Sequence, residues 1–456
     1  MPEKRASGKQ PQKRKSTTFP RGKHARSRAS RQGYASGRLP ENLPLSLSGS
    51  ESLAEVVVAK PSSHPNLFRK RLVRIQGKPQ VGDWVSVVVE QEHEETGEFL
   101  RSQLGYGWYN PKSEIAVRMV KWSDGMPDDA FWTQRMERAV SLRCKELLLD
   151  REVDCYRVLH AEADGVPGLV VDRFGDCLSA EVFSAAVAPR ARQILQGLQQ
   201  LLGTEHWLIQ PGPHLQPQEG FQLRSTRSQR LPSQLQVHEG DVQFLVRFAD
   251  SHKTGFFCDQ RENRARLAEF TRGKSVLDLC CYTGGFSVSA AKAGQAESVI
   301  GVDLDAAPLE IARRNAAINQ VKAKFTQADA FAYMRDMLRG GKQFDVVVLD
   351  PPKLIRNRSE LEEGTRKHFD LNRLAMQLVR PGGILLSCSC AGLLHTADFT
   401  RLVRAAARNA FLPTDFNPNP TPRDMQILAH SGAAACHPVA ANCPETEYLK
   451  AMWLRL

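Results

Sequence analysis

Short strand-like runs and helical patterns alternate along the C-terminal half of the chain, from about residue 250 to its end. The runs read SVLDLCC, ESVIGVDL, KAKFTQAD, FDVVVLD, GGILLSCS and EYLKAMWLRL, with helical segments between them, among them residues 365–378 and 397–410. Strands rich in Val, Ile and Leu that alternate with helices are typical of a parallel sheet covered on both faces. The pattern predicts an α/β domain over residues 249–456, Rossmann-like, with about seven mostly parallel strands.

The first half of the chain has a different pattern. Between residues 60 and 125, the stretches DWVSVVVEQ, FLRSQLGYGWYN and EIAVRMVKW are strand-like and separated by Gly, Pro and Asn, which predicts a small β-barrel. Residues 126–248 mix helical periodicity, at 130–150 and 188–203, with strands around the turn DGVPG. We expect a small α+β intermediate domain there.

Residues 1–59 are predicted to be a disordered basic tail and linker. Residues 1–40 hold 12 Lys and Arg against a single acid, Glu3, whereas the other 416 residues are close to neutral. A segment so rich in charge, Ser, Gly and Pro cannot bury enough apolar surface to fold alone. Its charge favours RNA binding, although a solubilising tail would look the same. A second basic cluster surrounds Phe68 at the start of the predicted barrel, where RNA contact and a solvated surface are equally compatible; its members are Lys60, Arg69, Lys70, Arg71, Arg74 and Lys78.

The sequence indicates a cytoplasmic protein with reduced thiols, neither membrane-bound nor metal-binding. No apolar run reaches the roughly 18 residues of a membrane span, and the N-terminus lacks the apolar core of a signal peptide. The ten cysteines contain no CxxC pair and no set with zinc-ligand spacing. Nothing in the pattern indicates an oligomeric state.

Three acids follow three consecutive predicted strands beside the glycine pair Gly284 and Gly285. Asp278 lies at the end of the first strand, where its carboxylate can accept an ammonium group. Asp303 ends the second strand, about twenty residues past the glycines, where a carboxylate can bind both ribose hydroxyls. Asp329 ends the third, in place for an adenine amino group. Each acid alone is most often a helix cap or surface group. Together, without a GxGxxG motif, they favour an adenosine with an amino-acid tail, which is S-adenosylmethionine.

The stretch VVVLDPPKL places Asp350, two prolines and Lys353 after another strand, at the edge where a methyl acceptor would arrive. Methyltransferases that act on exocyclic amines usually have an aromatic residue after the prolines, to stack the base. Lys353 in that place argues against amine methylation and leaves methylation of carbon open.

Two cysteines close together, Cys388 and Cys390, end the next strand in the stretch LLSCSCAGLL. Carbon-5 of cytosine is too weakly nucleophilic to take a methyl group until a thiolate adds to carbon-6, and an acid near the base must control the protons. Cys390 is nearer the carboxyl end of the strand, where ligands bind, so we expect it to be the nucleophile, and Cys388 to be a packing group. Cys280 and Cys281 are also expected to pack.

The chain from about residue 60 to 456 resembles the bacterial large-subunit (23S) ribosomal RNA cytosine-5 methyltransferases, which join a PUA domain, a β-rich central domain and a class I methyltransferase domain. The matching stretches are GWYNPKSEIAVRMV, DGVPGLVVDRFGD, KTGFFCDQRENR, YTGGFSVSA, VVVLDPPKL, SCSCAGL and PETEYLKA. The resemblance implies that residues 60–125 are the PUA domain and that Cys390 is the nucleophile, with Asp350 and Lys353 beside it. It implies cofactor contacts from the DQRENR and YTGGF segments and the strand-end acids: Gln260, Arg264, Tyr282, Thr283, Gly284, Gly285, Asp303, Asp329 and Asp350.

The sequence therefore predicts an S-adenosylmethionine-dependent RNA (cytosine-5) methyltransferase that acts on large-subunit ribosomal RNA. One alternative is a different nucleic-acid methyltransferase, with an exocyclic amine or another RNA as its acceptor. A second is a catalytically silent RNA-binding or ribosome-assembly protein, against which the intact Asp303, Asp350 and Cys390 argue.

Overall fold

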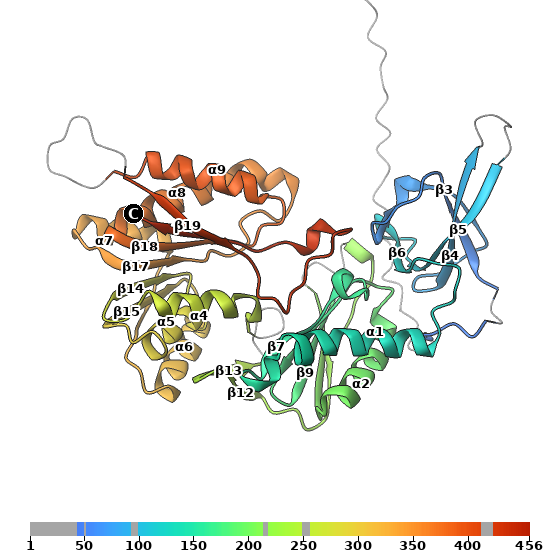
Figure 1. Ribbon diagram of the computed structural model, residues 1–456, viewed down its shortest axis with the longest axis horizontal. Coiled ribbons are helices and arrows are strands. Elements are labelled where there is room, and N and C mark those ends of the chain that lie inside the picture. The colour runs from blue at the N-terminus through green and yellow to red at the C-terminus, as the bar shows by residue number, and fades with distance from the viewer. Residues whose placement is uncertain (1–42, 50–51, 93–98, 213–217, 249–255, 412–422) are drawn as a thin grey trace, which may run out of the picture. The chain divides into compact units, whose positions relative to one another are not determined.

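The computed structural model describes residues 43–49, 52–92, 99–212, 218–248, 256–411 and 423–456 (Figure 1). The basic tail at 1–40, predicted to be disordered, lies outside these ranges. The described part of the chain carries three sets of strands in succession, in the order that the sequence predicts.

The first set is a six-stranded sheet. Its strand order is β2-β6-β5-β4-β1-β3, and every neighbouring pair is antiparallel except β1 with β4. Because β1 lies in the stretch predicted as linker, the sheet begins before residue 60. The strands are β1 (Ala54–Val58), β2 (Asn66–Phe68), β3 (Leu72–Gln76), β4 (Trp84–Glu92), β5 (Phe99–Tyr109) and β6 (Ile115–Lys121).

The basic cluster around Phe68 is partly used inside this sheet. The guanidinium of Arg69 donates to the backbone carbonyls of Asn110, Pro111 and Ser113, and so ties down the loop between β5 and β6. Arg74 forms an ion pair with Glu90 across the sheet surface. Arg71 donates to the hydroxyl of Ser62 at 2.9 Å. Three of the six cations in this cluster therefore already have partners within the protein.

In its described residues, the intermediate domain has the helices α1 and α2 and a five-stranded sheet of order β11-β10-β9-β8-β7. The helix predicted at 130–150 is shorter than expected, because α1 ends at Ser141 and continues as one wide π-helical turn to Glu146. The elements are α1 (Asp129–Ser141), β7 (Cys155–His160), β8 (Leu169–Phe174), β9 (Cys177–Val182), α2 (Ala191–Leu202), β10 (His206–Pro211) and β11 (Thr226–Arg227), followed by a separate hairpin of β12 (Gln234–Glu239) and β13 (Val242–Arg247).

Three tryptophans join the first sheet to this domain in one hydrophobic core. Trp108 of β5 stacks on Trp132 of α1, with ring centroids 5.7 Å apart and planes 4° from parallel, and Trp84 of β4 packs against both. The buried guanidinium of Arg190, which donates to the carbonyls of Pro44 and Ala186, lies 5.0 Å from the Trp108 ring. Aromatic stacking and this cation–π contact both add to the burial of apolar area.

The carboxylate of Glu219, which is 2% exposed, connects the same two domains through hydrogen bonds. It accepts from Arg118 of β6 at 3.0 Å, from Asn110 at 3.0 Å, from Ser113 at 2.8 Å and from the backbone N–H of Ala185 at 3.0 Å. A buried charge is tolerated when it is paired and hydrogen-bonded. Glu219 lies in a polar stretch between β10 and β11, where the hydrophobic pattern gives no sign of this role.

The C-terminal domain confirms the predicted parallel sheet, with seven strands in the order β16-β15-β14-β17-β18-β20-β19. Only β20 runs against its neighbours. Helices α7, α8 and α9 cover one face, and α4 and α5 the other (Figure 1). The elements are α4 (Arg261–Glu269), β14 (Ser275–Leu279), α5 (Gly285–Lys292), β15 (Ser298–Asp303), α6 (Ala306–Ile318), β16 (Lys324–Gln327), α7 (Ala330–Arg339), β17 (Phe344–Leu349), α8 (Leu361–Leu378), β18 (Val379–Ser389), α9 (Thr396–Arg408), β19 (Gln426–Ser431) and β20 (Lys450–Arg455). Among the described helices, none is long and apolar enough to cross a bilayer.

The β12–β13 hairpin is held against α6 by two asparagines one helical turn apart. Asn315 and Asn319 accept hydrogen bonds from the backbone N–H groups of Leu245 and Gln243, at 2.8 and 2.9 Å. The two amide oxygens accept hydrogen bonds from backbone N–H groups on the outer edge of β13, which would otherwise have no partner in the sheet. The hairpin thereby becomes part of the surroundings of the C-terminal sheet.

We predict that Glu219→Ala lowers the free energy of unfolding by about 3 kcal/mol, because it removes the buried acceptor that Arg118, Asn110 and Ser113 share and leaves Arg118 with only its longer ion pair to Glu162, at 3.3 Å. Chemical denaturation followed by tryptophan fluorescence measures this directly, since the stacked tryptophans lie in the adjoining core. Glu114→Ala, at an exposed position in the loop just before β6, is the matched control and should change stability by about 0.5 kcal/mol at most. Equal effects of the two substitutions would contradict the role given to Glu219.

Candidate functional site

Four strands of the C-terminal sheet deliver the predicted site residues to one edge. β15, β14, β17 and β18 are consecutive and parallel, so their carboxyl ends, followed by Asp303, Cys280, Asp350 and Cys390, lie next to one another. The pKa of the Cys280 thiol reflects this arrangement. Burial raises it most, and four nearby carboxylates raise it further. In order of their effect, these are Asp303, Asp350, Asp278 and Asp329. The predicted acids therefore converge.

Asp278 lies within β14 and is 1% exposed. One of its carboxylate oxygens, Oδ2, accepts from the backbone N–H of Ser287 at 2.9 Å and from its hydroxyl at 2.6 Å. The other, Oδ1, is buried without a partner among the described residues. Burial raises the pKa of Asp278 to about 7, Ser287 opposes the shift, and Asp303 adds to it. A buried acceptor with one free oxygen matches the ammonium group that the sequence analysis expected here.

The turn after β14 has an unusual backbone. Cys280, Tyr282 and Gly284 all have positive φ, at 62°, 49° and 76°, a conformation that costs energy for residues other than glycine. The turn is held from both sides: the backbone N–H of Tyr282 donates to Asp303 at 2.8 Å, and the carbonyl of Thr283 accepts from Asn315 at 2.9 Å. Such strain persists where the surroundings over-determine it.

Protein atoms lie close to both glycines of the pair. A Cβ at Gly284 would come within 3.0 Å of Ala312 and 3.1 Å of Phe325, and one at Gly285 within 3.3 Å of Arg264. Packing and the positive φ of Gly284 therefore give a structural reason for glycine here, and the contact of Gly284 and Gly285 with the cofactor stays a prediction.

Asp303 and Asp329 differ in their surroundings. Asp303 is half-buried, and its two oxygens accept the backbone N–H groups of Tyr282 at 2.8 Å and Asp305 at 3.0 Å. Asp329 is exposed and caps α7, accepting from the N–H of Ala332 at 2.9 Å. The ordinary explanation of a lone aspartate, a helix cap, thus holds for Asp329, and its contact with adenine stays a prediction.

The DQRENR segment supplies the partner of Asp350. Gln260 donates through Nε2 to Asp350 at 2.9 Å, and its Oε1 accepts from Asn263 at 2.6 Å. Asn263 in turn accepts from Ser431 at the end of β19, at 2.7 Å. This chain of bonds fixes which way the Gln260 amide points, so that a donor faces the Asp350 carboxylate.

The side chain of Arg264 is held by contacts within the protein. Its guanidinium forms a two-pronged ion pair with Glu239 of β12, at 2.8 and 2.5 Å, and also donates to the carbonyl of Phe257 at 3.0 Å. The side chain is buried and lies 4.7 Å from the Phe256 ring. These contacts join the hairpin of the intermediate domain to the loop before α4 and to the glycine turn. The direct cofactor contact implied by the resemblance stays a prediction.

The two cysteines of the LLSCSC stretch have different surroundings. Cys388, inside β18, is fully buried in a cluster with Leu386 and Trp453, in agreement with its expected packing role, and burial raises its pKa well above the ordinary value. Cys390 lies one residue past the end of β18 and is half-buried. Of the two thiols, Cys390 is the one at the edge where the acids converge. Cys281 is buried as expected, whereas Cys280 is half-buried in the strained turn.

Sequence reasoning missed Lys450, the first residue of β20. It is buried, and its ammonium donates to the carbonyls of Ala391, which follows Cys390, and Tyr448. Lys353, exposed in the loop after β17, lowers the Lys450 pKa and so lies close enough for their charges to interact. Lys450 belongs to the PETEYLKA stretch, where the signal was a lysine at the start of an otherwise apolar strand.

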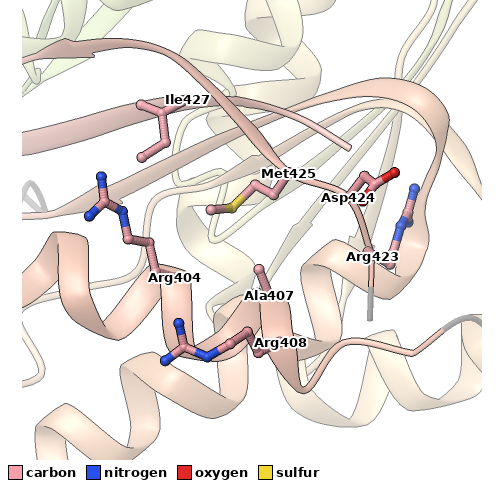
Figure 2. Close-up of a pocket in the computed structure, with 7 residues that line it drawn as sticks. All are labelled: Arg404, Ala407, Arg408, Arg423, Asp424, Met425 and Ile427. Carbon is pink, nitrogen blue, oxygen red and sulfur yellow. The ribbon is translucent and has the colours of Figure 1, made fainter. Parts of the chain in front are cut away.

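Several cavities lie in the described part of the chain. One of about 310 Å³ is lined by Lys450, Tyr448, Phe399 and residues between β19 and β20, so it adjoins the candidate site. A second, of about 670 Å³, lies beside Trp84 and Arg190, in the first half of the chain. A third, of about 480 Å³, is basic and is shown in Figure 2, with Arg404 and Arg408 of α9 beside Met425. It lies where β19 begins, at the amino edge of the sheet, and therefore opposite the converging acids.

Two clusters with metal-ligand chemistry occur in the described residues: Asp176, Glu205 and His206, whose carboxylates are exposed, and His64, Cys443 and Glu445. His64 Nδ1 accepts the backbone N–H of Asn66 at 3.0 Å, so the ring proton is on Nε2, which lies 3.1 Å from Glu445. Both ring nitrogens are therefore engaged within the protein, and neither has a lone pair free for an ion.

Comparisons with known proteins identify the family of the two matched domains. Residues 162–420 match the S-adenosylmethionine-dependent methyltransferase family, and residues 62–122 match the PUA-like domain family. Proteins named ribosomal RNA large subunit methyltransferase I are similar over 86% of this chain and 95% of their own length: the one from Tolumonas auensis is 34% identical, from Shewanella denitrificans 36%, and from Escherichia coli O1:K1 33%.

Among solved structures, a methyltransferase complexed with SAH superposes with a TM-score of 0.70 at 17% identity, covering 88% of this chain and all of that one. A SAM-dependent methyltransferase from Streptococcus mutans gives a TM-score of 0.68 over the same share of both chains, also at 17% identity. These likenesses confirm the fold, including the PUA-like and methyltransferase domains. The chain belongs to the S-adenosylmethionine-dependent methyltransferase family, in the branch that contains ribosomal RNA large subunit methyltransferase I.

Proposed function

We propose that this methyltransferase modifies carbon-5 of a cytosine in large-subunit ribosomal RNA. The single observation that carries the proposal is the position of Cys390, half-buried at the carboxyl edge of the sheet and one strand away from Asp350. Activation of a pyrimidine carbon needs a nucleophile and an acid on the same side of the cofactor edge. The names of the relatives support large-subunit ribosomal RNA as the substrate.

S-adenosylmethionine supplies an electrophilic methyl group when it is bound. The unpartnered Oδ1 of Asp278 fits its ammonium group, and Asp303, already held by two N–H groups, is placed for ribose hydroxyls. Tyr282 and Thr283 would line the cofactor through the strained turn, while Gln260 and Arg264 fix the loop beside it. Asp329 would reach the adenine amino group from the start of α7.

In the proposed reaction the Cys390 thiolate forms a bond to carbon-6 of cytosine, which makes carbon-5 nucleophilic. After carbon-5 has taken the methyl group, a base removes its proton and the bond from carbon-6 to sulfur breaks, restoring the aromatic ring and the thiolate. Asp350, oriented by Gln260, is the acid next to the base. Lys353, on the exposed loop after the two prolines, is placed to meet the RNA backbone.

The RNA would be bound by the PUA-like domain. Lys60, Lys70 and Lys78 are exposed there, whereas Arg69 and Arg74 are engaged within the sheet. Phosphate contacts by lysines give affinity and salt dependence without sequence preference. Methylation of an exocyclic amine is the alternative outcome, and the modified nucleoside distinguishes the two.

We predict that Asp278→Asn changes how stability depends on pH. The folded pKa of about 7 lies above the ordinary value of about 3.9, so the carboxyl holds its proton better in the folded state and costs stability as the pH rises from 4 to 7. Relative to wild type, the variant should gain about 2 kcal/mol or more in unfolding free energy between pH 5 and pH 8. Denaturation curves at both pH values measure the gain, and a pH-independent difference would contradict the assignment.

Asp303→Ala should weaken S-adenosylmethionine binding about tenfold or more, because charge-assisted hydrogen bonds to ribose are worth roughly 1.5–3 kcal/mol. Calorimetric titration of the folded variant gives the affinity. Asp303→Asn keeps an acceptor for the Tyr282 N–H but has no charge. It therefore separates an affinity loss caused by disruption of the turn from one caused by loss of the carboxylate charge. Asp305→Ala, two residues away and exposed, is the control and should bind normally; unaltered affinity in Asp303→Ala would refute the assignment.

Cys390 and Cys388 should behave differently toward RNA that contains 5-fluorocytosine at the target. That base has no carbon-5 proton to lose, so the covalent adduct should persist after methyl transfer and remain visible as a denaturant-stable band. Wild type and Cys388→Ala should form it; Cys390→Ala should not, yet should still bind S-adenosylmethionine. An adduct with Cys390→Ala would reverse the roles, and methylation by wild type without any adduct would rule out the cytosine-5 reaction.

A further inference from the structure

Lys450 is a buried cation beside the residue proposed as nucleophile. It is 4% exposed and pairs in register with Ser389, the last residue of β18. Its Nζ donates to the carbonyl of Ala391 at 2.6 Å and to that of Tyr448 at 2.8 Å. Since Ala391 directly follows Cys390, these two bonds fix the ammonium next to the segment that carries the thiol.

Burial of the Lys450 ammonium group costs free energy that an apolar packing residue would not cost. Two neutral carbonyls only partly replace the hydration of an ammonium group, and a buried cation without a hydrogen-bonded carboxylate is unfavourable. Burial accordingly lowers the pKa of Lys450 to about 8, and the charges of Cys390 and Glu447 raise it. The neighbouring strand residues Ala451, Met452 and Trp453 are apolar and buried. Lys450 also lines the cavity of about 310 Å³ between β19 and β20. A buried, perturbed cation at the wall of a cavity is typical of functional sites.

We propose that Lys450 is a positioning residue that favours the thiolate form of Cys390 and keeps the segment after β18 in place for attack on the base. A cation close to a thiol stabilises its ionised form, which is the nucleophile. The catalytic meaning of this inference rests on the proposed function, but the coupling of the two side chains does not require RNA.

Other charged groups at this edge also shift the pKa of Lys450. After burial, which lowers it most, Glu447 raises it and the second cation, Lys353, lowers it. On the helix side His368 is buried, accepts or donates at 3.2 Å with Ser389, and is kept neutral because burial and Lys450 lower its pKa to about 4. Asp350 and Cys388 are the acidic groups on the sheet side. Lys450 is the buried cation of this set, and so the one least screened by water.

A structural alternative is that Lys450 merely ties the ends of β18 and β20 together through the two carbonyls. In that case a neutral side chain that preserves the fold would leave the thiol unchanged. The two explanations therefore separate on a property of Cys390 alone, which is its reactivity as a function of pH.

The test is labelling of Cys390 by iodoacetamide in the full-length chain without RNA or cofactor, quantified by peptide mass spectrometry between pH 6 and pH 10. Lys450→Met should lower the labelling rate at pH 7 about tenfold and move the midpoint of the pH profile upward by about one unit. Lys450→Arg keeps the charge and should restore most of the rate. Lys342→Met, at an exposed position in the same domain, should label like wild type.

Lys450→Gln keeps a donor for the Ala391 carbonyl without the charge, and decides the question if Lys450→Met does not fold. A wild-type labelling profile in either folded neutral variant would overturn the inference. The 5-fluorocytosine adduct separates this failure from that of the proposed function. If wild type forms the adduct but the labelling profile of the variants is unshifted, only the role proposed for Lys450 is refuted. If labelling is shifted but wild type forms no adduct, the cytosine-5 reaction is refuted and the coupling of Lys450 to Cys390 stands.

Discussion

The bond from the backbone N–H of Tyr282 to the Asp303 carboxylate is the contact on which the carboxyl edge of the C-terminal sheet depends. It joins the turn after β14 to the end of β15 at 2.8 Å, and it requires the left-handed backbone at Cys280, Tyr282 and Gly284. Like charges repel at such short range, so several carboxylates at one edge need donors from the backbone. The turn supplies one of them, at the cost of local strain.

Much of the fold and part of the site could be predicted from the sequence because both follow from local rules. A strand that ends in an acid must deliver it to the edge where its parallel neighbours end, which is why Asp278, Asp303 and Asp350 converge. The contacts that hold these residues could not be predicted, since Glu239, Asn315 and Lys450 reach the edge from other parts of the chain. Such pairs depend on tertiary packing, for which hydrophobic periodicity carries no signal.

The glycine pair is supported by residues from outside its own turn. Ala312, Phe325 and Arg264 fill the space beside the two glycines. Arg264 in turn is held by Glu239 of the intermediate domain. The intermediate domain therefore supports the turn after β14 through one buried ion pair and through the contact of β13 with the asparagines of α6. It is more than a connection between the PUA-like and methyltransferase domains.

The core around Trp84, Trp108 and Trp132 has a consequence for how this chain can be divided. The PUA-like sheet contributes two of the three rings, and Arg190 of the intermediate domain lies over both of them. A cut near residue 125 would expose two indole rings on one fragment and a buried guanidinium on the other. The two domains should thus unfold as a single cooperative unit, and a PUA-like domain of this kind cannot be exchanged between proteins without its neighbour.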